Sequence, residues 1–380
     1  MTSLTNDSRP LPDRPNPRSK AMFVFLRLAS ASPQAYTALY DIGPFWFSGT
    51  STDTQLNVYV SDKHYQIELS ASNFEDSPTL LSEYLRHIER VDPENFKADE
   101  EEEESGDPLE DLHEWALTPF LPVFQTVFPL DRTRKYTLKD WLSAETLRYT
   151  LVIVEGKLSP SKLDPLEGRS IGASFAPSER AIYSAFPIYR PDEVRLPIDE
   201  DSRGLPAIPH KVFVSGHVQF FKLVFPGDVN STLREFNAYT KIRSAGLDSS
   251  VRTSKLDGVV EDNGRVIGLL LSYIDSKVGT LLCVGKDPAY SSFRQKWLDQ
   301  ISHSLNSLHA HNILWGDAKP DNVLIDTNND AYLIDFGGGY TVPWADGKNE
   351  NKIEGDKEAF EKIRDFLLKE DDPPHSSHLP

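Results

Sequence analysis

The chain has 380 residues, of which 39% are hydrophobic and 26% charged, a balance typical of a folded globular protein long enough for two domains. The formal net charge of −18 argues against nucleic acid as a general partner, because nucleic-acid-binding proteins present basic surfaces. One cysteine excludes an intramolecular disulfide, and no apolar run approaches the ~20 residues of a membrane span, so we expect an intracellular protein, cytoplasmic or nuclear, with no membrane partner.

Residues 21–187 are expected to form an N-terminal α+β region of unknown role, after a polar, proline-rich and disordered segment at 1–20. An acidic loop is predicted at 97–111, and its unbroken acidic block at 99–104 reads as a solvated segment in preference to a surface for a basic regulatory partner. The region carries no chemical motif. Its expected strands are 23–26, 56–60, 64–69 and 151–154, and its expected helices are 78–91 and 136–147.

A second domain is expected from residue 188 to residue 370, followed by a disordered tail at 371–380. Its expected strands are 194–196, 211–214, 218–224 and 267–274. Its expected helices are 232–244, which would end at Gly246, then 291–311 and 352–368.

The most specific pattern lies between residues 314 and 337. Asp317 and Asn322 are five residues apart, with Lys319 between them. Two apolar strands, 323–325 and 332–334, flank a polar turn and lead into Asp335, Phe336 and Gly337. A surface hairpin would explain the turn residues but not the charged and amide groups on either side of it.

This pattern resembles the catalytic loop and the metal-binding loop of the protein kinase superfamily. The resemblance implies an α+β, two-lobed protein-kinase-like fold with a truncated C-lobe, preceded by the mixed α/β N-terminal region. The N-lobe would comprise residues 188–274 and the C-lobe residues 275–370. The implied function is an ATP-dependent phosphotransferase, a kinase that transfers the γ-phosphate of MgATP to a hydroxyl group, with ATP and Mg²⁺ as cofactors.

The resemblance also implies the role of each residue in the pattern. Asp317 would orient the acceptor hydroxyl and take its proton, and Lys319 would offset charge on the transferring phosphoryl group. Asn322 and Asp335 would bind magnesium, which prefers hard oxygen ligands. Lys319 is typical of protein Ser/Thr kinases, so a protein hydroxyl is the favoured acceptor.

The nucleotide-binding residues are expected in the N-lobe. Lys222 resembles the strand lysine that contacts the phosphates. Its neighbours on both sides are apolar, which favours this role over that of a solvent-facing lysine on an amphipathic strand. Glu235 is placed to hold that lysine, although Thr232 and Glu235 also fit a helix capping box. The backbone of Ser272, Tyr273 and Ile274 would meet the adenine edge.

Three departures from the family pattern keep other functions open. No G-x-G-x-x-G precedes Lys222, and the candidate phosphate-covering loop at 199–209 contains only Gly204. Gly316 stands where protein kinases have arginine, a feature similar to small-molecule kinases such as aminoglycoside phosphotransferases. Only 43 residues follow Gly337, which resembles compact kinase-like proteins found in fungi.

The alternatives are therefore a small-molecule kinase, or a pseudokinase or scaffold that binds nucleotide without turnover. Asp356 is open to two interpretations, as the anchor of the catalytic-loop backbone or as a helix N-cap. The sequence carries no signal for an oligomeric state.

Overall fold

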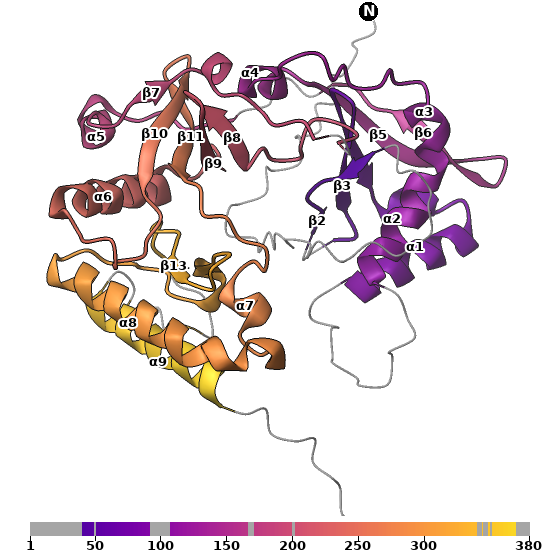
Figure 1. Ribbon diagram of the computed structural model, residues 1–380. Coiled ribbons are helices and arrows are strands. Elements are labelled where there is room, and N and C mark those ends of the chain that lie inside the picture. The colour runs from indigo at the N-terminus through magenta and orange to yellow at the C-terminus, as the bar shows by residue number, and fades with distance from the viewer. Residues whose placement is uncertain are drawn as a thin grey trace, which may run out of the picture. The chain divides into compact units, whose positions relative to one another are not determined.

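The computed structural model describes residues 40–48, 51–91, 107–165, 171–199, 202–339, 344, 349 and 352–369. The chain divides into two compact units (Figure 1). Unit 1 comprises Met1–Tyr136, Asp140–Gly168 and Ile198–Pro209, and unit 2 comprises Thr137–Lys139, Arg169–Pro197 and His210–Pro380. The segments predicted at 1–20, 23–26 and 371–380, and most of the acidic loop, lie outside the described residues.

The division differs from the domain boundary expected near residue 187. Residues 169–187 belong to unit 2, where α5 (Pro177–Tyr183) packs against α6 (Val229–Ala245). Tyr183 stacks on Phe236 with ring centroids 4.4 Å apart. An aromatic contact between segments far apart in sequence thus recruits this stretch to the second unit.

Unit 1 is built on a six-stranded mixed sheet in the order β1-β3-β4-β5-β6, with β2 paired to β3. The β3–β4 hairpin has the expected strands and turns at Ser61, whose φ of 57° is left-handed. The strands are β1 (Asp41–Ile42), β2 (Trp46–Phe47), β3 (Thr54–Val60), β4 (Lys63–Leu69), β5 (Glu145–Val154) and β6 (Lys157–Lys162).

The helices of unit 1 pack against its sheet and contribute buried side chains to the same core. Tyr84 and Leu112 are fully buried in one cluster with Leu56 and Ile67 of the sheet. Besides short 3₁₀ turns at Ala71–Phe74 and Thr118–Phe120, the helices are α1 (Pro78–Val91), as expected, α2 (Pro108–Leu117) and α3 (Leu121–Phe124).

Two expectations for this region are wrong. The acidic loop was expected to extend to residue 111, but α2 begins at Pro108, because the Asp107 carboxylate caps the helix by accepting the Leu109 N–H at 2.8 Å. The helix expected at 136–147 is reduced to α4 (Leu138–Leu142), and β5 begins at Glu145. Parallel pairing of β5 with β4 overrides the helical spacing there.

The segment expected to cover phosphates is held within unit 1. The Ser61 N–H donates to the Arg203 carbonyl at 3.1 Å, and the Leu205 N–H donates to the Ser61 carbonyl at 2.8 Å. A Cβ on Gly204 would lie 2.8 Å from the Ser61 oxygen, so this glycine serves a close backbone approach. The single glycine of 199–209 therefore has a packing role inside unit 1.

Unit 2 begins with a five-stranded sheet in the order β7-β10-β11-β9-β8. The strand expected at 194–196 is reduced to isolated bridges of Arg195 with Thr137 and with Phe213, and Arg195 exchanges two backbone hydrogen bonds with Phe213. Pro197, two residues further on, has no N–H with which to extend this ladder. The strands are β7 (Ile188–Tyr189), β8 (Lys211–Val214), β9 (His217–Leu223), β10 (Leu256–Asp262) and β11 (Arg265–Ser272).

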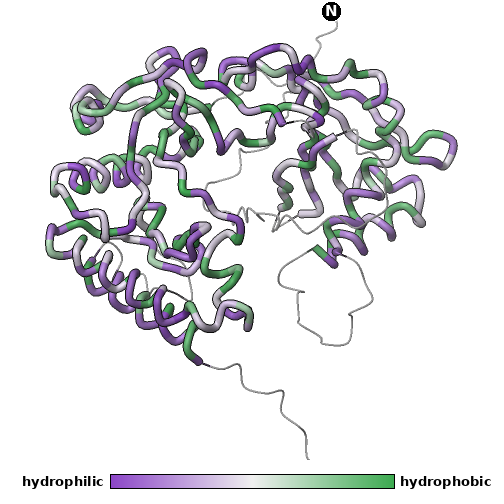
Figure 2. Tube along the Cα trace, in the orientation of Figure 1, coloured by the Kyte–Doolittle hydropathy of each residue, from purple (hydrophilic) through white to green (hydrophobic). Residues whose placement is uncertain are grey.

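The rest of unit 2 is helical apart from one small hairpin. Its helices carry hydrophilic and hydrophobic residues in alternation (Figure 2), and their apolar faces join a core that includes Trp297, Ile301 and Ile363. The elements are α7 (Leu281–Val284), α8 (Arg294–Ala310), β12 (Val323–Ile325), β13 (Ala331–Leu333) and α9 (Ile353–Leu368), with 3₁₀ turns at Pro191–Glu193, Pro288–Phe293 and Pro320–Asn322. Among the described residues, no helix is long and apolar enough to cross a membrane.

Candidate functional site

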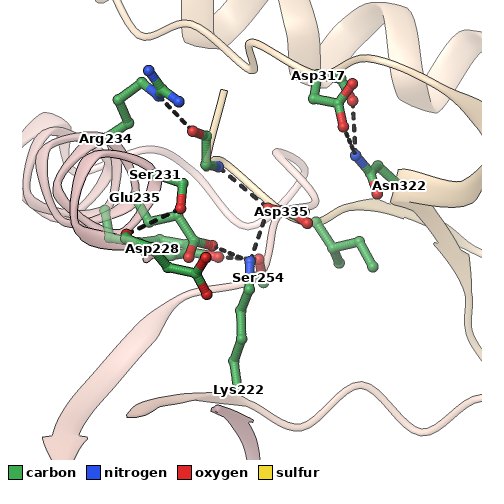
Figure 3. A network of polar contacts seen from close by, with 12 residues as sticks. Lys222, Asp228, Ser231, Arg234, Glu235, Ser254, Asp317, Asn322 and Asp335 are labelled. Carbon is green, nitrogen blue, oxygen red and sulfur yellow. Dashed lines mark hydrogen bonds and ion pairs between the residues drawn. The ribbon is translucent and has the colours of Figure 1, made fainter. Parts of the chain in front are cut away.

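Lys222 lies on β9, a strand paired on both sides, by β8 and by β11. Its ammonium lies 2.9 Å from a Glu235 carboxylate oxygen and 2.9 Å from Oδ1 of Asp335 (Figure 3). The sheet fixes the backbone of the lysine, and two carboxylates from separate elements hold its side chain. Lys222 therefore joins the sheet, α6 and the end of the β12–β13 hairpin.

Glu235 reaches Lys222 from the second turn of α6, a helix that starts three residues earlier than expected. Asp228 is the N-cap residue and Thr232 lies inside the helix, so the capping-box interpretation of Thr232 and Glu235 is wrong. Glu235 is 3% exposed and paired with Lys222. The short connection between β9 and α6 is what brings the first turns of the helix close to the lysine.

The three charged groups alter one another's ionisation. Burial raises the pKa of Glu235 above its ordinary value, although the Lys222 ammonium opposes this. Burial also acts to raise the pKa of Asp335, but the Lys222 charge and hydrogen bond outweigh it, and the pKa of Asp335 lies below its usual range. Burial acts to lower the pKa of Lys222, yet the two carboxylates raise it overall. Asp335 and Lys222 are thus an ionised pair at neutral pH.

The β12–β13 hairpin sets the spacing between the two aspartates of the motif. Three residue pairs join its strands, and the Ile334 N–H donates to the Asn322 carbonyl at 3.0 Å. Asp335 then adopts a left-handed φ of 60°, which is uncommon for a residue other than glycine. Phe336 is buried, with its ring centroid 5.4 Å from that of Tyr239 on α6.

Asp317 is held by the two other residues of its loop. The Lys319 ammonium lies 2.7 Å from Oδ2 of Asp317. The Asn322 amide nitrogen donates to the Asp317 carbonyl at 2.8 Å and to Oδ2 at 3.2 Å. Since the amide nitrogen is turned toward Asp317, the amide oxygen is the atom of Asn322 suited to a metal ion.

The backbone before Asp317 is anchored from α9. The Asp356 carboxylate accepts the Trp315 N–H at 2.9 Å and the Gly316 N–H at 2.8 Å, and it pairs with His309 at 2.9 Å. Lys352, and not Asp356, is the N-cap residue of α9, so of the two interpretations of Asp356 the anchor is the one the structure supports.

Gly316 is required by geometry. Its φ is 91°, and a Cβ at this position would lie 2.9 Å from the Gly338 Cα. A residue with a side chain would be strained and would also push against the backbone that follows Asp335. The glycine in place of arginine therefore permits close approach of the two loops.

A cavity of about 190 Å³ brings most of the predicted residues together. It contains Lys222, Glu235, Asp317 and Asp335, while Lys319 and Asn322 are bonded to Asp317 at its edge. Sequence reasoning missed Asp228 and Ser231, for which only the unusually short β9–α6 connection was a signal. The full lining is Lys222, Leu223, Val224, Asp228, Ser231, Thr232, Glu235, Asp317, Asp335, Gly337 and Gly338.

Ser272, Tyr273 and Ile274 do not line this cavity. The Ser272 N–H donates to the Lys255 carbonyl at 2.8 Å, and its hydroxyl accepts the Lys255 N–H at 2.9 Å. Tyr273 lies beside Lys211, whose ammonium is 5.4 Å from the ring centroid. A contact of this segment with adenine stays a prediction.

The oxygen donors of the cavity fit magnesium better than a softer metal. Asp335 offers a carboxylate and Asn322 an amide oxygen, which are ligands of hard cations. Among the described residues, no group of three or more His, Cys, Asp or Glu side chains is arranged to hold a metal. A metal ion here would therefore depend on phosphate oxygens for part of its coordination.

The comparison with known families agrees with this geometry. Residues 233–355 match the family model described as the protein kinase domain. The matched segment contains Glu235, Asp317, Lys319, Asn322 and Asp335, and Lys222 precedes it by 11 residues. The match spans about a third of the chain, and together with the fold it supports a protein kinase-like domain in the second unit.

Proposed function

We propose that this protein is an ATP-dependent phosphotransferase that transfers the γ-phosphate of MgATP to a hydroxyl group. One observation supports this above all others. Lys222 is ion-paired with both Glu235 and Asp335, and Asp317 lines the same cavity. A cation for phosphate, a metal ligand and a proton acceptor thus lie together in one cavity.

Each of these residues has a separate role in the proposed phosphoryl transfer. Lys222 contacts phosphate oxygens of the nucleotide, and Glu235 fixes the position of its ammonium. Asp335 and Asn322 hold Mg²⁺, which would neutralise charge on the phosphate oxygens when bound. Asp317 orients the acceptor hydroxyl and takes its proton, and Lys319, 2.7 Å from Asp317, stabilises negative charge on the phosphoryl group.

The charge of the cavity makes the proposed nucleotide binding depend on metal. Four carboxylates line it, those of Asp228, Glu235, Asp317 and Asp335, against one ammonium, that of Lys222. A free ATP anion would meet this excess of negative charge without compensation. We therefore expect the protein to bind MgATP much more tightly than ATP alone.

Nucleotide binding without turnover is the second candidate. It is favoured by the sequence before Lys222, which has no G-x-G-x-x-G and contains only Gly204 within 199–209. The backbone that covers phosphates in a glycine-rich loop has no counterpart among the lining residues. Retention of Asp317, Lys319 and Asn322 in mutual contact favours the enzyme.

The acceptor is proposed to be a protein Ser/Thr hydroxyl because Lys319 contacts Asp317. Transfer from γ-labelled ATP should be measured with protein pools and with hydroxylated small molecules, in parallel with thermal unfolding in MgATP. Label on protein with a thermal shift is the expected result. Label on a small molecule would change the acceptor, and a thermal shift with no transfer to any acceptor would favour the non-catalytic candidate.

A further inference from the structure

Helix α6 contacts both ends of the Asp335–Phe336–Gly337 segment through adjacent residues. Glu235 reaches Asp335 through Lys222 and also accepts the Phe336 backbone N–H. Arg234 reaches Gly337, because its Nε donates to the Gly337 carbonyl oxygen at 2.6 Å (Figure 3). The first contact is made by a buried carboxylate, and the second is a separate attachment of the same loop.

The Arg234 contact acts on a loop that needs restraint. Asp335 has a φ of 60° and Gly338 a φ of 68°, so left-handed residues lie on both sides of the buried Gly337. Such backbone persists in a non-glycine residue only when its surroundings hold it. A charge-assisted hydrogen bond to the Gly337 carbonyl is stronger than one between neutral groups.

The restrained peptide lies between the two functional loops. The Gly337 N–H lies 3.3 Å from Oδ1 of Asp335, the oxygen that also contacts Lys222. On the other side, Gly338 lies against Gly316, where an added Cβ would come within 2.9 Å of the Gly338 Cα. Fixing Gly337 therefore affects both the direction of the Asp335 carboxylate and the approach to the loop of Asp317.

We propose that Arg234 is a positioning residue, which holds the Asp335–Gly338 segment in the conformation that presents the Asp335 carboxylate to a metal ion. Arg234 is not among the residues that line the cavity, and it acts through the Gly337 carbonyl. The inference rests on the proposed function for its consequence, metal binding, but its structural part is independent of turnover.

The same helix supplies a matched control. Arg243 also donates from its guanidinium to a backbone carbonyl, that of Ala185, at 2.8 Å, and it stacks over Phe186. It does not line the cavity of Lys222 and Asp335. Arg243→Ala thus removes an arginine–carbonyl bond from α6 without affecting the metal-binding loop.

The test compares Arg234→Ala and Arg243→Ala in the full chain by two measurements. The first is amide hydrogen exchange of peptides that cover residues 332–339. The second is the Mg²⁺ concentration that gives half of the ATP-dependent thermal shift. Arg234→Ala should speed exchange in that peptide and raise the half-saturating Mg²⁺ concentration by about 10- to 100-fold, the range found when partners of metal ligands are removed.

Each outcome has a distinct meaning. Unchanged exchange, unchanged Mg²⁺ dependence, or the same change in Arg243→Ala would overturn the role of Arg234. Absence of any MgATP-dependent shift in the wild-type protein would overturn the proposed function instead, and faster exchange in Arg234→Ala would still support the restraint. Arg234→Met keeps most of the side-chain volume but has no donor, so Mg²⁺ affinity as low as in Arg234→Ala would support the hydrogen bond, and wild-type affinity would overturn it.

Discussion

Four charged residues of the cavity, Lys222, Glu235, Asp317 and Asp335, are each held by another charged residue, so the effects of single substitutions separate by role. Asp335 and Glu235 share Lys222, and Asp317 is bound by Lys319 and Asn322. The first group faces the expected nucleotide and metal, and the second the expected acceptor hydroxyl. Binding and turnover are therefore expected to depend on different residues.

Asp335→Ala and Asp317→Ala should give different kinetic signatures. Asp335→Ala removes the proposed metal ligand and a partner of Lys222, so MgATP binding should be lost together with turnover. Asp317→Ala should leave the MgATP dissociation constant within about threefold and lower kcat by about 10²- to 10⁴-fold, the range for a general base. Isothermal titration and initial rates measure both. Unchanged MgATP affinity and rate in Asp335→Ala would contradict the assignment.

Gly316→Ala should reduce both stability and activity, because it combines left-handed strain with a collision at Gly338. Gly216→Ala is a suitable control, since Gly216 has a similar φ of 84° and no atom within 4 Å of the added Cβ. Both variants should lose about 1–2 kcal/mol from backbone strain. Only Gly316→Ala should also lower turnover. Equal stability and activity in the two variants would show that the two loops do not approach as closely as the structure has them.

Helix α2 illustrates how an element of unit 1 depends on an uncharged histidine. His113 is 4% exposed, and its ring lies edge-on to Phe45 with centroids 6.2 Å apart. Burial lowers the pKa of His113 to about 4, although the carboxylate of Asp107, the N-cap residue of α2, acts in the opposite direction. The neutral ring is the form that packs.

Unit 1 should consequently lose stability in mild acid. Above pH 6.5 His113 is neutral in both folded and unfolded chains and has no effect. As the pH falls from 6.5 to about 4, the unfolded chain takes up the proton and the folded chain does not, so the free energy of unfolding decreases, by roughly 3 kcal/mol in total. His113→Phe should flatten this part of the pH profile in urea titrations, whereas His87→Phe should retain most of it. A wild-type profile that rises toward pH 4 would contradict the explanation.

The division into two units predicts a local response to nucleotide. The candidate site lies wholly within unit 2, and each unit has its own buried core. At 100 times the dissociation constant, MgATP should stabilise the unit that binds it by about 2.7 kcal/mol. Hydrogen exchange should slow in peptides of β9, α6 and the β12–β13 hairpin, and β3 and β4 should be unaffected. Equal protection of both units from exchange would count against this site. So would the absence of protection in both the wild-type protein and Asp335→Ala.

Several features could be predicted from local sequence, because they depend on neighbouring residues. Alternation predicted the β3–β4 hairpin, and apolar spacing predicted α1 and α8. The spacing of Asp317, Asn322 and Asp335 predicted a short hairpin that joins the two loops, and β12 and β13 form it. The spacing of nearby residues is enough to predict this hairpin, because the turn and its two strands are contiguous in the sequence.

Other features depended on residues distant in the chain. The pairing of β5 with β4 replaced an expected helix, and the contact of Tyr183 with Phe236 drew residues 169–187 into unit 2. Hydrogen bonds to Ser61 hold residues 203–205 in unit 1, a packing that local sequence did not predict, and the phosphate-covering role expected for 199–209 stays a prediction. Thr232 and Glu235 also fitted a capping box, the less favoured interpretation, but α6 begins at Val229 with Asp228 as its N-cap residue.

The sequence alone predicted which residues would carry the proposed chemistry, because metal binding, charge neutralisation and proton transfer require particular functional groups at particular spacings. It did not show that Arg234 attaches α6 to Gly337, nor that Gly316 and Gly338 must both lack a side chain. Those contacts join segments about a hundred residues apart or place two loops back to back, and they exist only once the sheet, the helix and the hairpin have packed around one core.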